Sequence, residues 1–145
     1  MKILSLLLAV SALAFTGCST VNPATTQLNS KLSSMKSAYV ITHGGTSADM
    51  DLHLQEALVK RGLTVKAGPE ESKAADVDFY ASYTDTWRWD LTMYLKELHI
   101  AFYDAKSGAL LASGSFNNSF LHSFPNPADK VRDVIATMYG ERPQE

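Results

Sequence analysis

Residues 77–90 read Val77-Asp78-Phe79-Tyr80-Ala81-Ser82-Tyr83-Thr84-Asp85-Thr86-Trp87-Arg88-Trp89-Asp90. From Phe79 onward the odd positions are apolar or aromatic apart from Asp85, and most of the even positions are polar. This alternation predicts a half-buried strand, because successive side chains of a strand point to opposite faces. Asp85 interrupts the apolar face, so we expect the strand to bulge or to leave the core there.

The next segment, residues 91–103, predicts a second strand with an irregularity. Its apolar positions are odd in the first half and even in the second. A bulge near Lys96 and Glu97 would restore a single inward face. Asp104-Ala105-Lys106-Ser107-Gly108 then predicts a hairpin turn, because Asp favours the first position of a turn and Gly tolerates positive φ. Residues 110–120 continue as the partner strand.

Two amphipathic helices flank these strands in the sequence. Residues 37–42 predict a first strand, residues 46–61 have helical apolar spacing, and Gly62 provides a C-terminal cap before a strand at 63–67. Near the other end, Asn126 and Pro127 predict the N-cap and first position of a second helix.

The order β-α-β-β-β-β-α predicts a single α+β domain over residues 38–140. We expect a two-layer sandwich, with a mostly antiparallel sheet of four to five strands and two helices on one face. Residues 141–145 form a C-terminal tail in this interpretation. Pairing through an edge strand could produce a dimer, but the sequence leaves the oligomeric state open.

The first residues of the chain, 1–17, are typical of a secretory signal. Lys2 precedes an apolar run that ends at Phe15, and Gly17 stands directly before the only cysteine, Cys18. A permanent transmembrane helix needs about 20 apolar residues, so the run is too short to span a bilayer. We therefore expect this segment to be removed.

Phe15-Thr16-Gly17-Cys18 resembles the bacterial lipobox, in which the cysteine is acylated after the signal is cut. This resemblance implies a membrane anchor at Cys18, and Ser19 after the cysteine favours the periplasmic face of the outer membrane. The polar residues 18–37 would be the lipidated cysteine and a flexible tether. The alternative is an ordinary signal peptide with a chance cysteine.

The chain has 13 basic and 15 acidic residues and a formal net charge of −2. Nucleic acid selects basic patches, so this balance argues against it as a partner. Asp49, Asp51, His53 and Glu56 form the densest group of metal-ligand types, but residues two apart on a helix point in different directions. We expect no metal and no cofactor.

Two hypotheses about function remain open. In the first, the domain is a non-enzymatic module that binds an envelope protein or a glycan through Tyr83, Trp87, Arg88 and Trp89, since large aromatic rings dominate interfaces. The competing interpretation of Trp87 and Trp89 is a core position, because they share parity with Phe79. In the second, the chain is a small hydrolase that pairs a histidine with a serine. The candidate residues for this pair are His43 or His122 with Ser47 or Ser123.

The chain from about residue 37 to 140 resembles small Gram-negative lipoproteins whose domain is similar to the N-terminal domain of TolB. The resemblance rests on the lipobox, the strand-helix-strand opening and three short motifs. These are Ala74-Ala75-Asp76-Val77-Asp78-Phe79, Trp87-Arg88-Trp89-Asp90 and the turn Asp104-Ala105-Lys106-Ser107-Gly108. It implies an α+β fold and a role in envelope assembly, and no functional residue is carried over from it.

Overall fold

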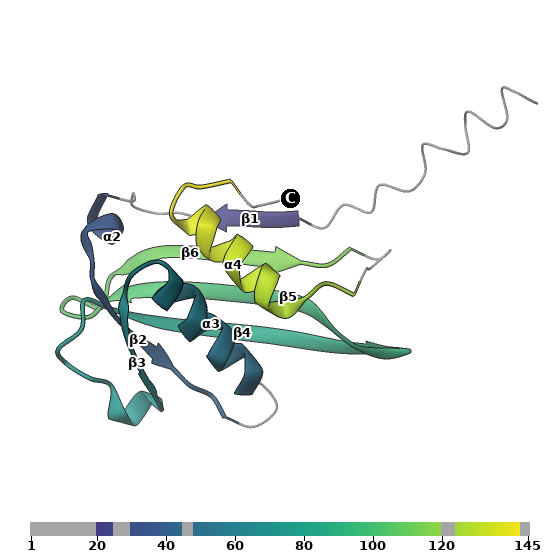
Figure 1. The fold of residues 1–145 in the computed structure, drawn as a ribbon, viewed down its shortest axis with the longest axis horizontal. Coiled ribbons are helices and arrows are strands. Elements are labelled where there is room, and N and C mark those ends of the chain that lie inside the picture. Colours follow the sequence, from purple (N-terminus) through teal and green to yellow (C-terminus); the bar gives the residue numbers. More distant parts are fainter. Residues whose placement is uncertain (1–19, 25–29, 45–47, 120–123, 143–145) are drawn as a thin grey trace, which may run out of the picture.

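The structure is a computed structural model, and it describes residues 20–24, 30–44, 48–119 and 124–142. These residues fold into one sheet with helices packed on it (Figure 1). The elements, in chain order, are β1 (Thr20–Ala24), α2 (Ser30–Ser34), β2 (Ser37–Ile41), α3 (Ala48–Lys60), β3 (Thr64–Gly68), the 3-10 turn η2 (Glu70–Ser72), β4 (Phe79–Asp90), β5 (Thr92–Asp104), β6 (Leu110–Asn117) and α4 (Pro127–Met138).

Within the described residues the sheet has six strands, in the order β1-β6-β5-β4-β2-β3. The pairings from β1 through β6 and β5 to β4 are antiparallel, whereas β2 pairs in parallel with both β4 and β3. The sheet is therefore mixed, with most of its pairings antiparallel as expected, and it has one strand more than the four to five predicted because β1 pairs at its edge. Parallel pairing arises because α3 crosses over between β2 and β3, which brings β3 back in the same direction.

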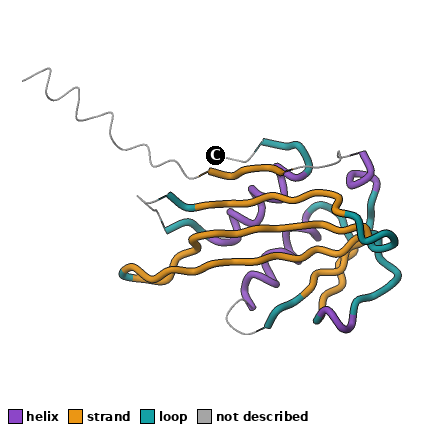
Figure 2. The backbone as a smooth tube through the Cα atoms, turned by 180° about the vertical axis from the view of Figure 1, so that it is seen from behind, coloured by secondary structure: helices purple, strands orange, loops and turns teal. Residues whose placement is uncertain are grey.

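The predicted α+β class and the two helices on one face are confirmed. Helices α3 and α4 pack side by side on the sheet, and Figure 2 shows the other face without a helix. Asn126 caps α4 as expected, since its side-chain oxygen accepts a 2.9 Å hydrogen bond from the backbone N–H of Ala128. The core between the two layers consists of fully buried apolar side chains, among them Leu54, Leu58, Phe79, Ile100, Phe102, Val134 and Met138.

A glycine sets the distance between α4 and the sheet. A Cβ atom at Gly114 of β6 would lie 2.9 Å from Cγ1 of Val134 and 3.0 Å from Cγ of Met138. The contact with Val134 is closer than packed carbon atoms allow and the one with Met138 is very tight, so a side chain at this position would displace α4 or its side chains.

The expected bulge near Lys96 and Glu97 is present in β5. Thr86 of β4 lies opposite Glu97 and Trp87 lies opposite Leu95, so Lys96 has no partner on β4. The extra residue allows Leu95 and Leu98 to point to the same buried face despite their different parity. Asn118 holds the bulge, because its backbone N–H donates to the carbonyl of Lys96 at 2.9 Å and its side-chain amide donates to the carbonyl of Leu95 at 3.3 Å.

Part of the segment that we expected to be a flexible tether belongs to the fold. Residues Thr20–Ala24 form β1, which pairs with β6 at the edge of the sheet, and residues Ser30–Ser34 form α2. Leu32 of α2 is buried in the core, and Lys31 forms an ion pair with Asp104 in the β5–β6 turn. The polar sequence of 18–37 did not predict these contacts, because edge pairing is set by the neighbouring strand rather than by the segment's own pattern.

Candidate functional site

The β4–β5 hairpin extends beyond the rest of the sheet. Its last pairs, from Trp87 opposite Leu95 to Asp90 opposite Thr92, continue past Glu97, where β6 ends its pairing with β5 at Asn117. Figures 1 and 2 both show this hairpin projecting past the ends of β6 and the two helices. The side chains of its outer part therefore have no helix above them.

Burial falls steadily along the hairpin on the face that continues the core. Leu95 is fully buried, and Trp87 is half-buried against the core and donates its indole N–H to the Asp85 carboxylate at 2.5 Å. Two pairs further out, on the same face, Trp89 is 72% exposed and its partner Met93 is 55% exposed. We call Trp89, Leu91 and Met93 the apolar tip. It is an extension of the core face that nothing in the described part of the chain covers.

Leu91 is the residue at the turn of the hairpin, and its backbone is strained. Its φ is +59°, in the left-handed region, and its side chain is 86% exposed. A residue with a Cβ atom pays about 1–2 kcal/mol to adopt this conformation, which Gly or Asn tolerates better. An exposed leucine in this position contributes nothing to the core that would offset the strain.

The residues around the tip carry both charges. Arg88 and Asp90 flank Trp89 and are exposed. The neighbouring Tyr94 lies on the opposite face of β5 from Met93. Its ring makes an edge-to-face contact with the half-exposed Phe124 at a centroid distance of 5.8 Å. The tip is therefore an apolar surface with balanced charge rather than a basic or acidic patch.

Tyr83, which the sequence grouped with the tryptophans, lies in the core and not on the apolar tip. Its hydroxyl donates a 2.8 Å hydrogen bond to the buried Asp51 carboxylate, and its ring meets the ring of His43 edge-on at 5.0 Å. Burial, followed by the Asp51 carboxylate, raises the pKa of Tyr83 far above its usual value. Of the four predicted binding residues, the structure brings Trp87, Arg88 and Trp89 together on the hairpin and separates Tyr83 from them. Leu91 and Met93 were missed, although an apolar residue at the junction of two strands was a usable signal.

The histidine and serine pair of the hydrolase hypothesis is not assembled from described residues. Ser47, His122 and Ser123 lie outside the residues that the structure describes. His43 is exposed after β2, and its ring contacts the ring of Tyr83. Among the described residues, no group of three or more His, Cys, Asp or Glu side chains lies close enough together to hold a metal ion.

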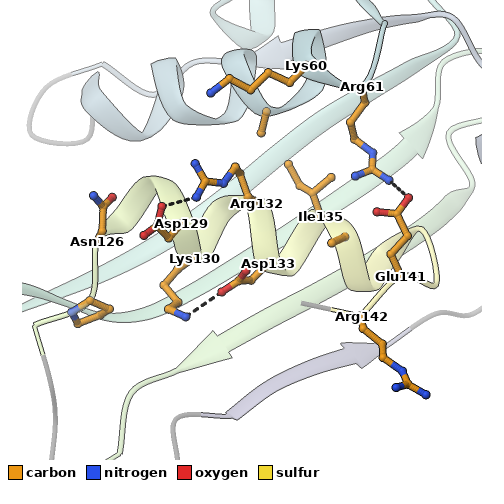
Figure 3. A pocket seen from close by; sticks show the side chains of 13 residues that line it. Lys60, Arg61, Asn126, Asp129, Lys130, Arg132, Asp133, Ile135, Glu141 and Arg142 are labelled. Atoms are coloured by element: carbon orange, nitrogen blue, oxygen red, sulfur yellow. Dashed lines mark hydrogen bonds and ion pairs between the residues drawn. The ribbon is translucent and has the colours of Figure 1, made fainter. Parts of the chain in front are cut away.

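A cleft of about 650 Å³ lies between α3 and α4 (Figure 3). Most of its charged residues are already paired with one another: Arg61 with Glu141, Lys130 with Asp133, and Arg132 with Asp129. Lys60 and Arg142 have no ion-pair partner among the described residues, but Figure 3 shows them on opposite sides of the cleft. The cleft thus lacks converging cations that would hold an anion.

Comparisons with known proteins identify the fold and no family. No protein-family model and no curated protein matches the chain. The solved structures that do match include two of PelC from Paraburkholderia phytofirmans, both dodecamers. The first, a point variant, is 14% identical, with a TM-score of 0.63 over 84% of this chain and 98% of that one. The second is 16% identical, with a TM-score of 0.58 over 88% and 100%. At this identity the likeness shows a shared fold alone.

Proposed function

We propose that the chain is a membrane-anchored bacterial lipoprotein, lipidated at Cys18, whose domain is a non-enzymatic binding or assembly module of the cell envelope. Its place would be the periplasmic face of the outer membrane. The anchor is supported by the signal-like residues 1–17 and by Phe15-Thr16-Gly17-Cys18, which resembles a lipobox. Two or more acyl chains are enough for stable anchoring, since each buried CH₂ contributes about 0.8 kcal/mol. Among the described residues, no helix is long and apolar enough to cross a bilayer.

The binding role rests on a single observation, the apolar tip. A side chain of the size of Trp89 that stays 72% exposed on an extension of the core face is a typical centre of an interaction surface. The strained and exposed Leu91 beside it also supports a binding role. Its backbone conformation costs stability and its side chain packs against nothing in the core, which is typical of a functional position. The PelC structures are dodecamers, which is consistent with an assembly role for a domain of this fold.

Crosslinking in intact cells tests the binding role. We would compare the wild type with Trp89→Ser and with the control Tyr103→Ser, which removes an exposed aromatic ring of β5 near the opposite end of the sheet. We expect a reproducible crosslinked envelope component, lipid or protein, that is lost in Trp89→Ser and kept in Tyr103→Ser, with both variants folded. Equal crosslinking by all three proteins would contradict a binding role for the tip.

A further inference from the structure

We infer that the apolar tip inserts into the same bilayer to which Cys18 anchors the chain, so that the domain stands on the membrane by this end of its sheet. The inference rests on the proposed lipidation of Cys18, and it names the partner of the tip. It is carried by the register of the strands, by the length of chain between Cys18 and β1, and by the chemistry of the tip.

The register places the start of β1 and the hairpin tip at the same end of the sheet. Thr20, the first residue of β1, lies opposite Asn117 of β6, and Asn117 lies opposite Glu97 of β5. The hairpin continues outward from Glu97 to its turn at Leu91. In Figure 1 the arrow of β1 starts on the side on which the hairpin projects.

The hairpin projects further from the sheet than the connection from Thr20 to Cys18 can reach, so the tip would lie deeper in the membrane than the anchored residue. Only Ser19 lies between Cys18 and Thr20, and these two residue steps reach at most about 7 Å when fully extended. From Thr86, which lies opposite Glu97, to Asp90 the hairpin advances about 13 Å at 3.3 Å per residue, because the bulged Lys96 adds no length. A Cys18 held at the membrane surface therefore draws the tip to a depth of at least about 6 Å, which falls in the range of about 5–10 Å of interfacial insertion.

The short connection also removes the freedom to turn this end away from the membrane. Because β1 is hydrogen-bonded into the sheet from Thr20 onward, residues between β1 and β2 give no slack to the anchor. A tether of all 20 residues from 18 to 37 would have let the domain move off the surface, as the sequence had suggested. With β1 paired, the sheet end and the anchor stay together.

The tip has the composition of a membrane-inserting loop. Trp favours the interface between headgroups and acyl chains, and Leu and Met gain free energy from leaving water. Arg88 and Asp90 next to Trp89 balance each other, so attraction to anionic lipid is not the driving force. Insertion should therefore be equally strong in zwitterionic and in anionic vesicles, and it should depend little on the salt concentration.

The two tryptophans of the chain provide the test. Trp87→Phe leaves Trp89 as the only reporter, and Trp89→Phe leaves the half-buried Trp87 as the matched control. Both proteins and the wild type would be purified from bacterial membranes in their processed form. They would be reconstituted into phosphatidylcholine vesicles with plain or brominated acyl chains. Fluorescence reports quenching by the bromines and by iodide in the water, and the intact mass of each sample reports acylation of Cys18.

We expect brominated chains to quench Trp89 about twofold and Trp87 much less, and iodide to quench Trp89 weakly. Leu91→Ser, an exposed change that spares the core, should at least halve the bromine quenching of Trp89. Trp89 that is open to iodide and unaffected by bromine would overturn the inference while leaving the anchor intact. Shielding from iodide without bromine quenching would also overturn it, since a second copy or another protein would then cover the tip. An unmodified Cys18 would overturn the proposed function and this inference together.

Discussion

Trp89 and Met93 lie directly opposite each other on the projecting β4–β5 hairpin, and both side chains are mostly exposed although they continue the face on which Leu95 is fully buried. The pair marks the point where the core face extends past the helices. The strand pattern does not change there. Only the helices that cover the sheet end there. The alternation of apolar and polar residues that builds the core therefore produces an exposed apolar surface beyond them.

Replacing Leu91 tests whether its strained backbone lowers the stability of the domain. Leu91→Asn should raise the free energy of unfolding by about 0.5–1 kcal/mol, because Asn tolerates the positive φ better and no core contact is lost. Leu91→Ala keeps the strained backbone and serves as the control, with no gain expected. Urea denaturation measures both, and a loss of more than 1 kcal/mol in Leu91→Asn would show that Leu91 has a structural role.

The buried hydrogen bond between Tyr83 and Asp51 should contribute to stability. We expect Tyr83→Phe to lower the free energy of unfolding by about 1–3 kcal/mol, because it leaves the buried carboxylate without this donor. Tyr80→Phe is the control, since its hydroxyl makes only a 3.4 Å bond to the carbonyl of Ala74. Chemical denaturation compares the two, and equal costs would argue against a special role for the Asp51 contact.

The same tyrosine gives a prediction at alkaline pH. Its pKa in the fold is raised above 10.0, so the folded state holds the phenol proton more tightly than the unfolded state does. This contribution is present in full below pH 10 and is lost as the pH rises further. Urea denaturation between pH 9 and pH 11 should show a smaller alkaline loss of stability in Tyr83→Phe than in the wild type. An identical loss in both proteins would contradict this.

Asp104 should matter at acidic pH. Hydrogen bonds from Lys31 and then from Ser107 hold the pKa of its carboxyl below the usual 3.8. A lowered folded-state pKa means stabilisation that is present above about pH 4 and is lost as the pH falls through the lowered value. Asp104→Asn should therefore be less stable than the wild type at pH 7, and the difference should shrink toward pH 2. A difference that stays constant across this range would be inconsistent with the contacts described.

Close packing of α4 on β6 should make Gly114 intolerant of a side chain. We expect Gly114→Ala to cost about 1–3 kcal/mol, because its Cβ would overlap Val134 and Met138. Ser115→Ala, one residue along the same strand, should change stability by no more than about 0.5 kcal/mol. Thermal denaturation of the two variants distinguishes the outcomes, and a neutral Gly114→Ala would mean that α4 can shift at little cost.

Local sequence chemistry predicted most of the elements correctly. The β5 bulge followed from the change in parity between Leu95 and Leu98, and the α4 cap followed from Asn126 and Pro127. The turn before β6 was equally readable, since Gly108 has the positive φ that its position required. These features depend on neighbours in the chain, and a single sequence contains that information.

Features set by distant contacts were not predictable in the same way. Strand β1 exists because the edge of β6 accepts it, and Thr20–Ala24 contain no alternating pattern of their own. Parity alone could not tell whether Trp89 is core or surface, because that depends on where the helices end above the sheet. Tyr83 was predicted to be a binding residue, but it is buried. The sequence could not show this, because its hydrogen-bond partner Asp51 comes from α3.

The most direct test of the account is the intact mass and location of the protein in cells. Our proposal predicts an N-terminal peptide that begins at Cys18, carries diacylglycerol, and is found in the outer-membrane fraction. Cys18→Ser should abolish both the acyl mass and the processing before residue 18. A mature protein with a free Cys18 thiol, recovered in the soluble periplasmic fraction, would contradict the anchor and with it the proposed place of this domain on the membrane.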